Sequence, residues 1–446
     1  MEIPRICAVL LGCAIALVPP KACADDAPLA EAMRRGLVGK PPASRHMTPA
    51  RWEREQRAAV DKSETLMHRA LEEPGLLAQY AFMKARYDGD DDRVFRMVFG
   101  QYLSWFQTWI GDYDGARASF SIARAAQRDD AASPVDGGFH ARPAAATILA
   151  LARDRKAVFF NEDHSAPVTR TLTVELLAGL RAQGFDYFAA ETLSTSAEAL
   201  PHGYPTARNG FYANEPICGE MLRTALRLGY HVVAYDVEES APDLRERASA
   251  QALYEKVFRR DPDARLVVDA GFSHIQKSGD YLGGASMAQV FEKISGIEPL
   301  AVEQTMMIEH PRAADDHPYY RAAVVALHPT APFVYVNDSG AAWTLKPRQY
   351  DISVFFPPET RDGGRPGWLS LDGQRRPFPV SGADCRERFP CLIEARYAEE
   401  GADAVAADRV SLDADVQSRL YLFPGTYRLS ALDRDGNVIA ARDIGL

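Results

Sequence analysis

The chain has 446 residues, of which 47% are hydrophobic and 25% charged, a composition typical of a globular protein with two or three domains. Its formal net charge of -10 at pH 7 argues against nucleic acid as a partner and against docking on an anionic membrane. Both of these partners require a basic protein surface.

The first 24 residues are predicted to be a secretory signal peptide. Arg5 gives a short positive region, Ile6–Val18 is almost wholly apolar but short for a bilayer span, and Ala22-Cys23-Ala24 offers the small residues that a signal peptidase recognises. An uncleaved anchor and a lipoprotein cleavage site at Cys13 are the alternatives. No later segment is long and apolar enough for a transmembrane helix. We expect a periplasmic or secreted protein with no membrane span.

Residues 25–141 are predicted to form a helical N-terminal region. Apolar residues recur at helical spacing over residues 99–126, and Gly111-Asp112-Tyr113 interrupts them. The segment after this break places Ala116, Phe120 and Ala123 on one helix face. This spacing resembles the second helix of a tetratricopeptide repeat. Because only one copy is visible, we favour a helical hairpin packed on the next domain over a peptide-binding array. A protein partner that binds this region is the alternative.

Strands and helices alternate over residues 142–345. The expected strands are 157–160, 187–190, 231–235, 266–268 and 300–303, and the expected helices are 169–183, 216–228, 244–259 and 287–294. This alternation predicts an α/β domain, with a mostly parallel sheet and helices on both faces.

Residues 346–446 show short alternating strands broken by turns, which predicts a small C-terminal β-sandwich. The expected strands are 352–356, 392–397, 419–423, 427–432 and 438–440, the last after the Asp435-Gly436 turn. Removal of the signal peptide leaves three cysteines. Cys385 and Cys391 bracket a short loop and could form a disulfide in an oxidising compartment, whereas Cys218 is expected to be a buried small side chain.

Carboxylates or histidines directly follow four successive strands of the predicted sheet. They are Glu162 and His164, then Glu191, then Asp236, and finally His274 after Gly271. Ligands of an open parallel sheet bind outside the carboxyl ends of its strands. Carboxylates or histidines at the ends of four strands therefore predict a site for a small-molecule substrate or ligand at this edge of the sheet.

Histidine titrates near neutrality, so His164 or His274 can accept a proton from water and return it to a leaving group. A neighbouring carboxylate, Glu162 or Glu191, would fix the tautomer of the imidazole and stabilise its protonated form. Arg245 could hold a substrate carbonyl or stabilise an oxyanion.

Other residues are expected to contact the substrate. Gly271 would let the backbone approach it closely, and Asp236 lies at a strand end. The long loop 193–214 would form a lid or an apolar wall that includes Tyr204 and Tyr212.

The same residues could instead bind a divalent metal ion. Two histidines and a carboxylate, here His164, Glu191 and His274, make an adequate catalytic site with one open position. No cofactor is assigned from the sequence, because ligands on different strands leave no local spacing to test.

These motifs resemble those of the erythromycin esterase-like proteins. The segments Asn161-Glu162-Asp163-His164, Ala190-Glu191, Arg245-Glu246 and Ala270-Gly271-Phe272-Ser273-His274-Ile275 occur in the order seen there. That family belongs to a superfamily with the haem-binding uptake proteins and the Tiki proteases, marked by two Gly-x-x-His motifs and a glutamate after a strand. The resemblance covers only the central domain. The second motif matches, whereas Asn161 stands where the first usually has glycine.

The resemblance implies an α/β fold with the site between the two motifs. In the esterase branch, a histidine activates water against an ester or lactone without a metal. We therefore expect an exported hydrolase, with His164 as the general base and with His274 and Arg245 stabilising the oxyanion. The alternatives are a metal-dependent peptidase of the Tiki type and a non-catalytic protein that binds haem or another ligand or acts as a scaffold.

Overall fold

The computed structural model describes residues 49–194, 200–237 and 242–446. The predicted signal peptide, with Cys13 and Cys23, and part of the predicted lid therefore lie outside the described residues. Within those ranges, no helix is both long and apolar enough to cross a membrane.

The N-terminal region is helical, as predicted. Its helices are α3 (Pro49–Leu71), α4 (Leu76–Asp88), α5 (Arg93–Trp109) and α6 (Tyr113–Ser119). The predicted break falls between α5 and α6, where the Asp112 side chain caps α6 by accepting a hydrogen bond from the Gly115 amide. The prediction that helical structure continues to Ala126 is wrong. Phe120 already has an extended backbone, and the Arg124 amide donates to the Asp315 carbonyl at 2.7 Å, so Ala123 lies outside any helix.

The α/β core is built on an eight-stranded sheet with the order β1-β7-β8-β6-β2-β5-β3-β4. Its strands are β1 (Phe139–Pro143), β2 (Ala157–Glu162), β3 (Tyr187–Ser194), β4 (His231–Asp236), β5 (Leu266–Gly271), β6 (Leu300–Met307), β7 (Phe333–Asn337) and β8 (Ile352–Phe355). The strands from β8 to β4 pair in parallel. β7 pairs antiparallel with β8 on one side and with the edge strand β1 on the other. The mostly parallel sheet is therefore confirmed.

Helices cover both faces of this sheet. They are α7 (Ala144–Ala152), α8 (Val168–Ala182), α9 (Pro216–Arg227), α10 (Pro242–Leu253) with the π-helical turn η2 (Tyr254–Phe258), α11 (Met287–Ser295) and α12 (Pro318–Leu327). Successive side chains of a strand point to opposite faces. Phe160 accordingly belongs to the buried cluster that contains Leu172 and Leu176 of α8, whereas Phe159 packs on Phe291 of α11 at a ring distance of 5.2 Å.

The C-terminal region consists of antiparallel sheets. One pairs β11 (Arg376–Ser381) with β14 (Gln417–Leu422), and the other has the order β13 (Asp408–Leu412), β12 (Cys391–Tyr397), β15 (Thr426–Leu432) and β16 (Val438–Gly445). Three short elements precede them, β9 (Arg361–Asp362), β10 (Arg365–Pro366) and the 3-10 turn η3 (Gly367–Ser370), and the 3-10 turn η4 (Gly382–Cys385) lies between β11 and β12. Cys385 and Cys391 form the expected disulfide, and Cys218 is free and buried.

One strand is misassigned by the sequence. The pattern of residues 352–356 predicts the start of the C-terminal β-region, but β8 pairs with β6 and β7 inside the eight-stranded sheet. All four of its residues are buried, as is usual for an inner strand that is covered on both faces.

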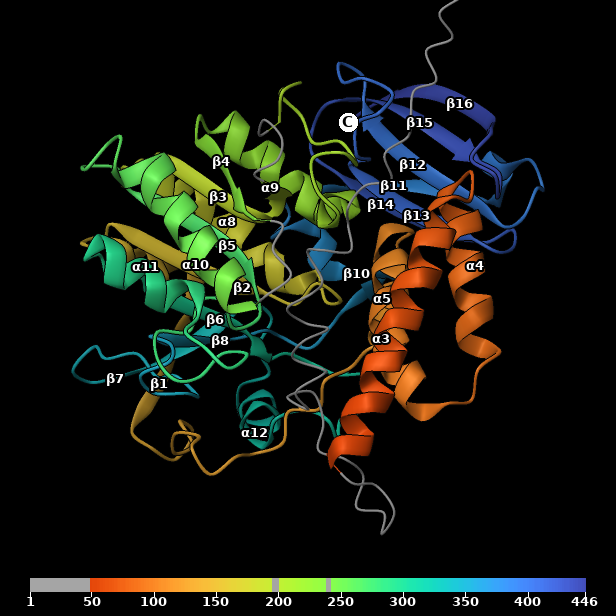
Figure 1. Ribbon diagram of the computed structural model, residues 1–446. Coiled ribbons are helices and arrows are strands. Elements are labelled where there is room, and N and C mark those ends of the chain that lie inside the picture. Colours follow the sequence, from red (N-terminus) through yellow and green to blue (C-terminus); the bar gives the residue numbers. More distant parts are fainter. Residues whose placement is uncertain (1–48, 195–199, 238–241) are drawn as a thin grey trace, which may run out of the picture.

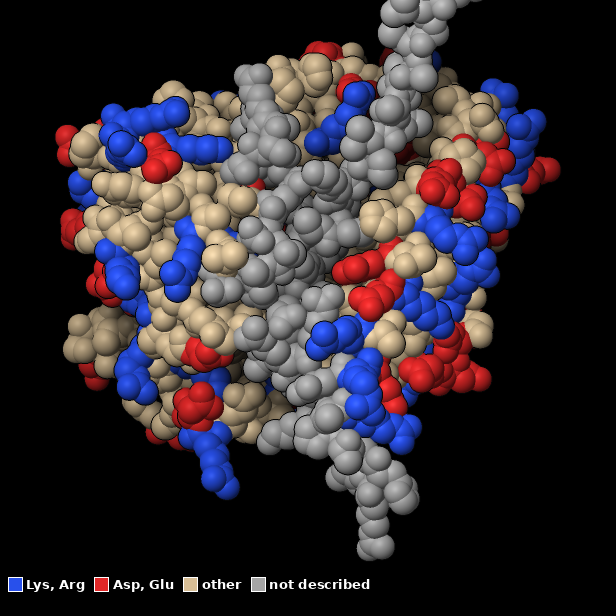
Figure 2. All heavy atoms as spheres, in the orientation of Figure 1, with Lys and Arg blue, Asp and Glu red and all other residues tan. Residues whose placement is uncertain are grey.

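The N-terminal helices lie beside the C-terminal strands, to one side of the core (Figure 1). The Ala78 amide donates to the Arg434 carbonyl at 3.0 Å, and Leu77 and Ile110 share a buried cluster with Leu392 of β12. Figure 2 shows acidic and basic side chains interspersed over this part of the visible face rather than segregated.

Candidate active site

The first part of the site is a histidine–carboxylate pair at the end of β2. His164 Nδ1 lies 2.9 Å from Glu162 Oε1, and Arg170 of α8 donates to both oxygens of the same carboxylate, at 2.5 and 2.8 Å. The His164 ring stacks on Tyr212 with 3.8 Å between centroids. All of these side chains are buried, so this geometry fixes the orientation of the imidazole.

Electrostatics keep Glu162 ionised. Burial opposes its charge, but Arg170 and His164 outweigh that effect and hold the pKa of Glu162 well below its usual range. The adjacent carboxyl of Asp269 behaves in the opposite way. Burial and the negative charge of Glu162 raise the pKa of Asp269 well above its usual range. These effects favour the protonated form of Asp269, which can donate a hydrogen bond to Glu162.

Arg170 also connects this pair to the rest of the molecule. Its Nη1 donates to Glu215 at 3.1 Å, and Glu215 caps α9 by accepting from the amides of Ile217 and Cys218. The Tyr113 hydroxyl lies 3.3 Å from the same carboxylate. Burial raises the pKa of Glu215. The guanidinium thus links β2, α8, α9 and the N-terminal helices.

Glu191 lies between the two histidines. It is inside β3, which continues to Ser194 rather than ending before Glu191 as predicted. Its Oε1 is 4.0 Å from His164 Nε2 and 3.6 Å from His274 Nε2. Arg245 donates to it at 3.1 Å, and the Gly271 amide donates to its other oxygen. Burial opposes ionisation, but the charges of His274 and Arg245 prevail and lower the pKa of Glu191 to about 2.

A second histidine–carboxylate pair faces the first. His274 Nδ1 lies 2.6 Å from Glu246 Oε1, and the other oxygen of Glu246 accepts from the Met287 amide of α11 at 2.6 Å. Tyr281 is 3.5 Å from His274 Nε2. Burial acts against protonation, yet Glu246 and Glu191 together raise the pKa of His274. This ring therefore favours the imidazolium form.

Gly271 and Asn161 shape the backbone between the two pairs. A Cβ at Gly271 would clash with His164 Nε2 and would lie 3.1 Å from Glu191 Oε2. The Asn161 amide group donates to the Phe272 carbonyl at 2.7 Å and accepts from the Gln304 amide at 2.6 Å. Asn161 thus bonds β2 to β6 and to the turn after β5, a role that glycine could not fill.

The structure gives Arg245 partners that the sequence does not predict. Its Nε donates to Asp236 at 2.9 Å while Nη2 reaches Glu191, and the whole side chain is buried. Arg245 and Asp236 therefore join the cluster as the group that holds Glu191, and this guanidinium is already bound to two carboxylates.

Of the two tyrosines predicted to contact substrate, Tyr212 joins the cluster and Tyr204 does not. The Tyr204 hydroxyl lies 3.3 Å from Asp403 of the C-terminal region. The remaining histidines also have other surroundings: His231 is exposed beside Tyr187, and His310 is buried with Asp316 at 3.0 Å.

The metal candidates His164, Glu191 and His274 converge, and each imidazole has a carboxylate partner at Nδ1, an arrangement that metal-binding histidines also show. In the part of the chain that the structure describes, no group of three or more His, Cys, Asp or Glu side chains has an arrangement suited to a metal ion.

The sequence does not predict that three further residues contact the histidine–carboxylate pairs: Arg170, Asp269 and Glu246. Asp269 carried a usable signal, because it is a lone carboxylate inside the apolar strand Leu266–Gly271. Glu246 stood next to Arg245 in a matched motif, but only the fold shows that it contacts His274. Arg170 had no local signal.

No family model matches the sequence, and no curated protein matches it. Among solved structures, the type III effector HopBA1 aligns at 14% identity and TM-score 0.32, over 50% of this chain and 99% of that one. A structure described as bacterial protein toxins gives 14% and 0.29, over 55% and 46%. RRSP, a MARTX toxin effector domain from Vibrio vulnificus CMCP6, gives 15% and 0.25, over 57% and 50%. The chain thus spans about half the length of the last two. At these TM-scores the likeness carries no functional assignment.

Proposed function

We propose that this protein is an exported hydrolase of the erythromycin esterase-like type, in which His164 activates water against an ester or lactone. The observation that carries the proposal is the convergence of two histidine–glutamate pairs on Glu191. His164 with Glu162 and His274 with Glu246 approach it from neighbouring strands, β2 and β5.

His164 has the geometry of a general base. Its Nδ1–H donates to the ionised Glu162, which leaves Nε2 as the acceptor for a proton of water. The water oxygen then attacks the carbonyl carbon, and Glu162 stabilises the imidazolium that forms. Because Arg170 holds Glu162 with two hydrogen bonds, the ring stays aligned while it changes charge.

His274 suits the opposite role. Its protonated ring would donate from Nε2 to the carbonyl oxygen as negative charge develops there, or to the leaving alkoxide as the C–O bond breaks. The distances of 3.6 Å to Glu191 and 3.5 Å to the Tyr281 hydroxyl are longer than a normal hydrogen bond, so a substrate oxygen would replace only weak contacts of this donor. Arg245 acts indirectly, by holding Glu191 in place together with Asp236.

The test is hydrolysis of p-nitrophenyl esters and of lactones by the purified mature protein. His164→Ala should lower kcat by about 10²–10⁴-fold, the usual contribution of a positioned base, with unchanged thermal unfolding. His140→Ala is the matched control, because it also removes a histidine–carboxylate pair, 3.0 Å from Asp338, but on the exposed edge strand β1. Equal activity of the two variants would contradict the assignment.

Two further measurements distinguish the alternatives. A stoichiometric divalent ion in protein purified without chelator would favour the metal-dependent peptidase. A Soret band on haem titration that is lost in His164→Ala, without any ester turnover, would favour a ligand-binding protein.

A further inference from the structure

A cavity of about 420 Å³ lies on the other side of α8, away from the histidine pairs. It is enclosed by the start of α7, the outer face of α8, the segments 329–332 and 356–360, and the turn η3. Its volume lies within the range of small-molecule sites. None of the described residues that line it belongs to the catalytic cluster.

The charges that line this cavity are all negative. Glu175 of α8, Glu359 and Asp372 contribute carboxylates, and no Lys, Arg or His is among the described residues of its wall. Glu359 is compensated from behind by Arg117 at 3.2 Å and by Arg361 at 2.5 Å. Neither α7 nor segment 329–332 contributes a titratable group to the wall.

Glu175 lacks such compensation. In the described part of the chain, its carboxylate makes no hydrogen bond or ion pair, and Asp372 is the charged group that acts on it most. Burial, reinforced by the negative charge of Asp372, raises the pKa of Glu175 to about 7. A cation placed beside it would therefore be attracted without having to displace a resident partner.

The rest of the wall combines apolar residues with three threonines and one serine. Phe356 and Trp368 line the cavity together with several prolines. The indole of Trp368 is held in place because its Nε1 donates to Glu359 at 3.1 Å and its edge packs against Tyr113 at 4.9 Å. A fixed indole beside carboxylates is a favourable environment for an organic cation.

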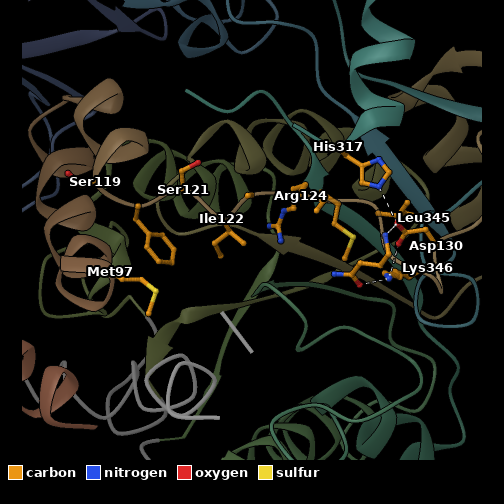
Figure 3. A pocket seen from close by; sticks show the side chains of 14 residues that line it. Met97, Ser119, Ser121, Ile122, Arg124, Asp130, His317, Leu345 and Lys346 are labelled. Atoms are coloured by element: carbon orange, nitrogen blue, oxygen red, sulfur yellow. Dashed lines mark hydrogen bonds and ion pairs between the residues drawn. The ribbon is translucent and has the colours of Figure 1, made fainter. Parts of the chain in front are cut away.

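A second cavity, of about 430 Å³, differs from the first in the charges that line it (Figure 3). It has an apolar end at Met97 and Ile122 and a polar end at His317 and Lys346. Its lysine is already neutralised, because Lys346 Nζ lies 2.7 Å from Asp129 and 2.8 Å from Asp130. Arg124 also lines this cavity and donates to the Thr305 carbonyl at 3.3 Å. The wall of this second cavity therefore carries both signs of charge, whereas the charged groups of the cavity at Glu175 are all carboxylates.

We propose that the cavity at Glu175 binds a small organic cation, a primary or quaternary ammonium group that carries an apolar or aromatic substituent. The ammonium group lies between Glu175 and Asp372, and the substituent packs against Trp368 and Phe356. This site is independent of the hydrolase proposed above.

The test is calorimetric titration of the full mature chain with benzyltrimethylammonium, whose charge does not depend on pH. Binding is expected at pH 8.5 and should be about 30-fold weaker at pH 5.5, because only about 3% of Glu175 is then ionised for a pKa near 7. Near pH 7, binding should release about half a proton, seen as a dependence of the enthalpy on the buffer. Neutral benzyl alcohol should bind at least about tenfold more weakly than the cation.

Glu175→Gln should weaken binding of the cation by at least about tenfold and remove its pH dependence. Glu292→Gln on α11, across the sheet, should behave as the wild type. If Glu175→Gln fails to fold, Asp372→Asn in an exposed turn provides the same test. Equal affinity for benzyl alcohol, unchanged binding to both carboxylate variants, or no binding at pH 8.5 would each overturn the proposal.

Discussion

The pKa values of two groups of carboxylates in this molecule are shifted in opposite directions. At the fully buried site on β2 and β3, the pKa values of Glu162 and Glu191 are lowered. On the other side of α8, the pKa of Glu175 is raised to about 7. Burial acts in the same direction on all three and favours the protonated form.

The difference lies in their partners. Glu162 has Arg170 and His164, and Glu191 has Arg245 and His274, whereas Glu175 has only another carboxylate nearby. A buried carboxylate with a built-in cation is suited to holding a histidine in a fixed orientation. One without a cation is suited to receiving a cation from outside. The predictions below test this difference between the two groups.

The largest expected effect comes from removing the cation of Glu162. Arg170→Met should lower the free energy of unfolding at pH 7 by about 3–5 kcal/mol, because it leaves a buried charge without its partner. Chemical denaturation measures this change. Arg428→Met removes an exposed pair with Asp443 and should cost less than about 1 kcal/mol. A similar small cost at both positions would contradict the conclusion that Arg170 compensates the buried charge of Glu162.

The next effect concerns the spacing between the two pairs. Gly271→Ala should lower kcat for ester hydrolysis by about 100-fold, or about 2.7 kcal/mol, since its Cβ would push His164 away from Glu191. Gly445→Ala serves as the control, because a Cβ there meets no atom within 4 Å. Full activity of Gly271→Ala would show that the close approach is unnecessary.

Replacing Glu175 should stabilise the protein at pH 8, whereas replacing Arg170 should destabilise it. The pKa of Glu175 is about 7 in the folded protein against an ordinary value of 4.5, so its contribution is fully present below pH 4.5 and is lost as the pH rises through 7. Glu175→Gln should therefore stabilise the protein at pH 8 by on the order of 1–3 kcal/mol and have little effect at pH 4. Thermal unfolding of both proteins at the two pH values measures this, and destabilisation at pH 8 would contradict it.

The smallest effect is a shift in the pH dependence of hydrolysis. The pKa of His274 is raised, mainly by Glu246 against the effect of burial, so its imidazolium form is complete below pH 6.5 and is lost as the pH rises through the raised value. Glu246→Gln should therefore move the alkaline limb of kcat/KM to lower pH. An unmoved limb would mean that another group sets it.

Much of the sheet and part of the site follow from the sequence. Apolar runs separated by helical patterns locate β2, β3, β4, β5 and β6. The residues that follow these runs include His164, Glu191 and His274, which the sequence alone is enough to place at one edge of the sheet. This succeeds because parallel strands, buried on both faces, are continuous apolar runs with a defined end.

The rest depends on tertiary contacts. β8 has only four residues, and such a short apolar run carries no information about which sheet it joins. β7 begins with a strand-like run, Phe333–Val336, but the run does not show which sheet it joins, and the edge strand β1 has no such run. The sequence assigns Arg245 to an oxyanion, but its partners Asp236 and Glu191 come from two other strands. The cavity at Glu175 requires α8 to meet Asp372, which no local pattern encodes.

The most direct test of the account is a pH titration of side-chain carboxyl resonances by ¹³C NMR, with Glu162, Glu191 and Glu175 assigned through their Gln variants. The account predicts that Glu175 titrates near pH 7 while Glu162 and Glu191 remain ionised throughout the range from about pH 8 to about pH 4.5. Titration of Glu175 below about pH 5, or of Glu162 or Glu191 near neutrality, would contradict it.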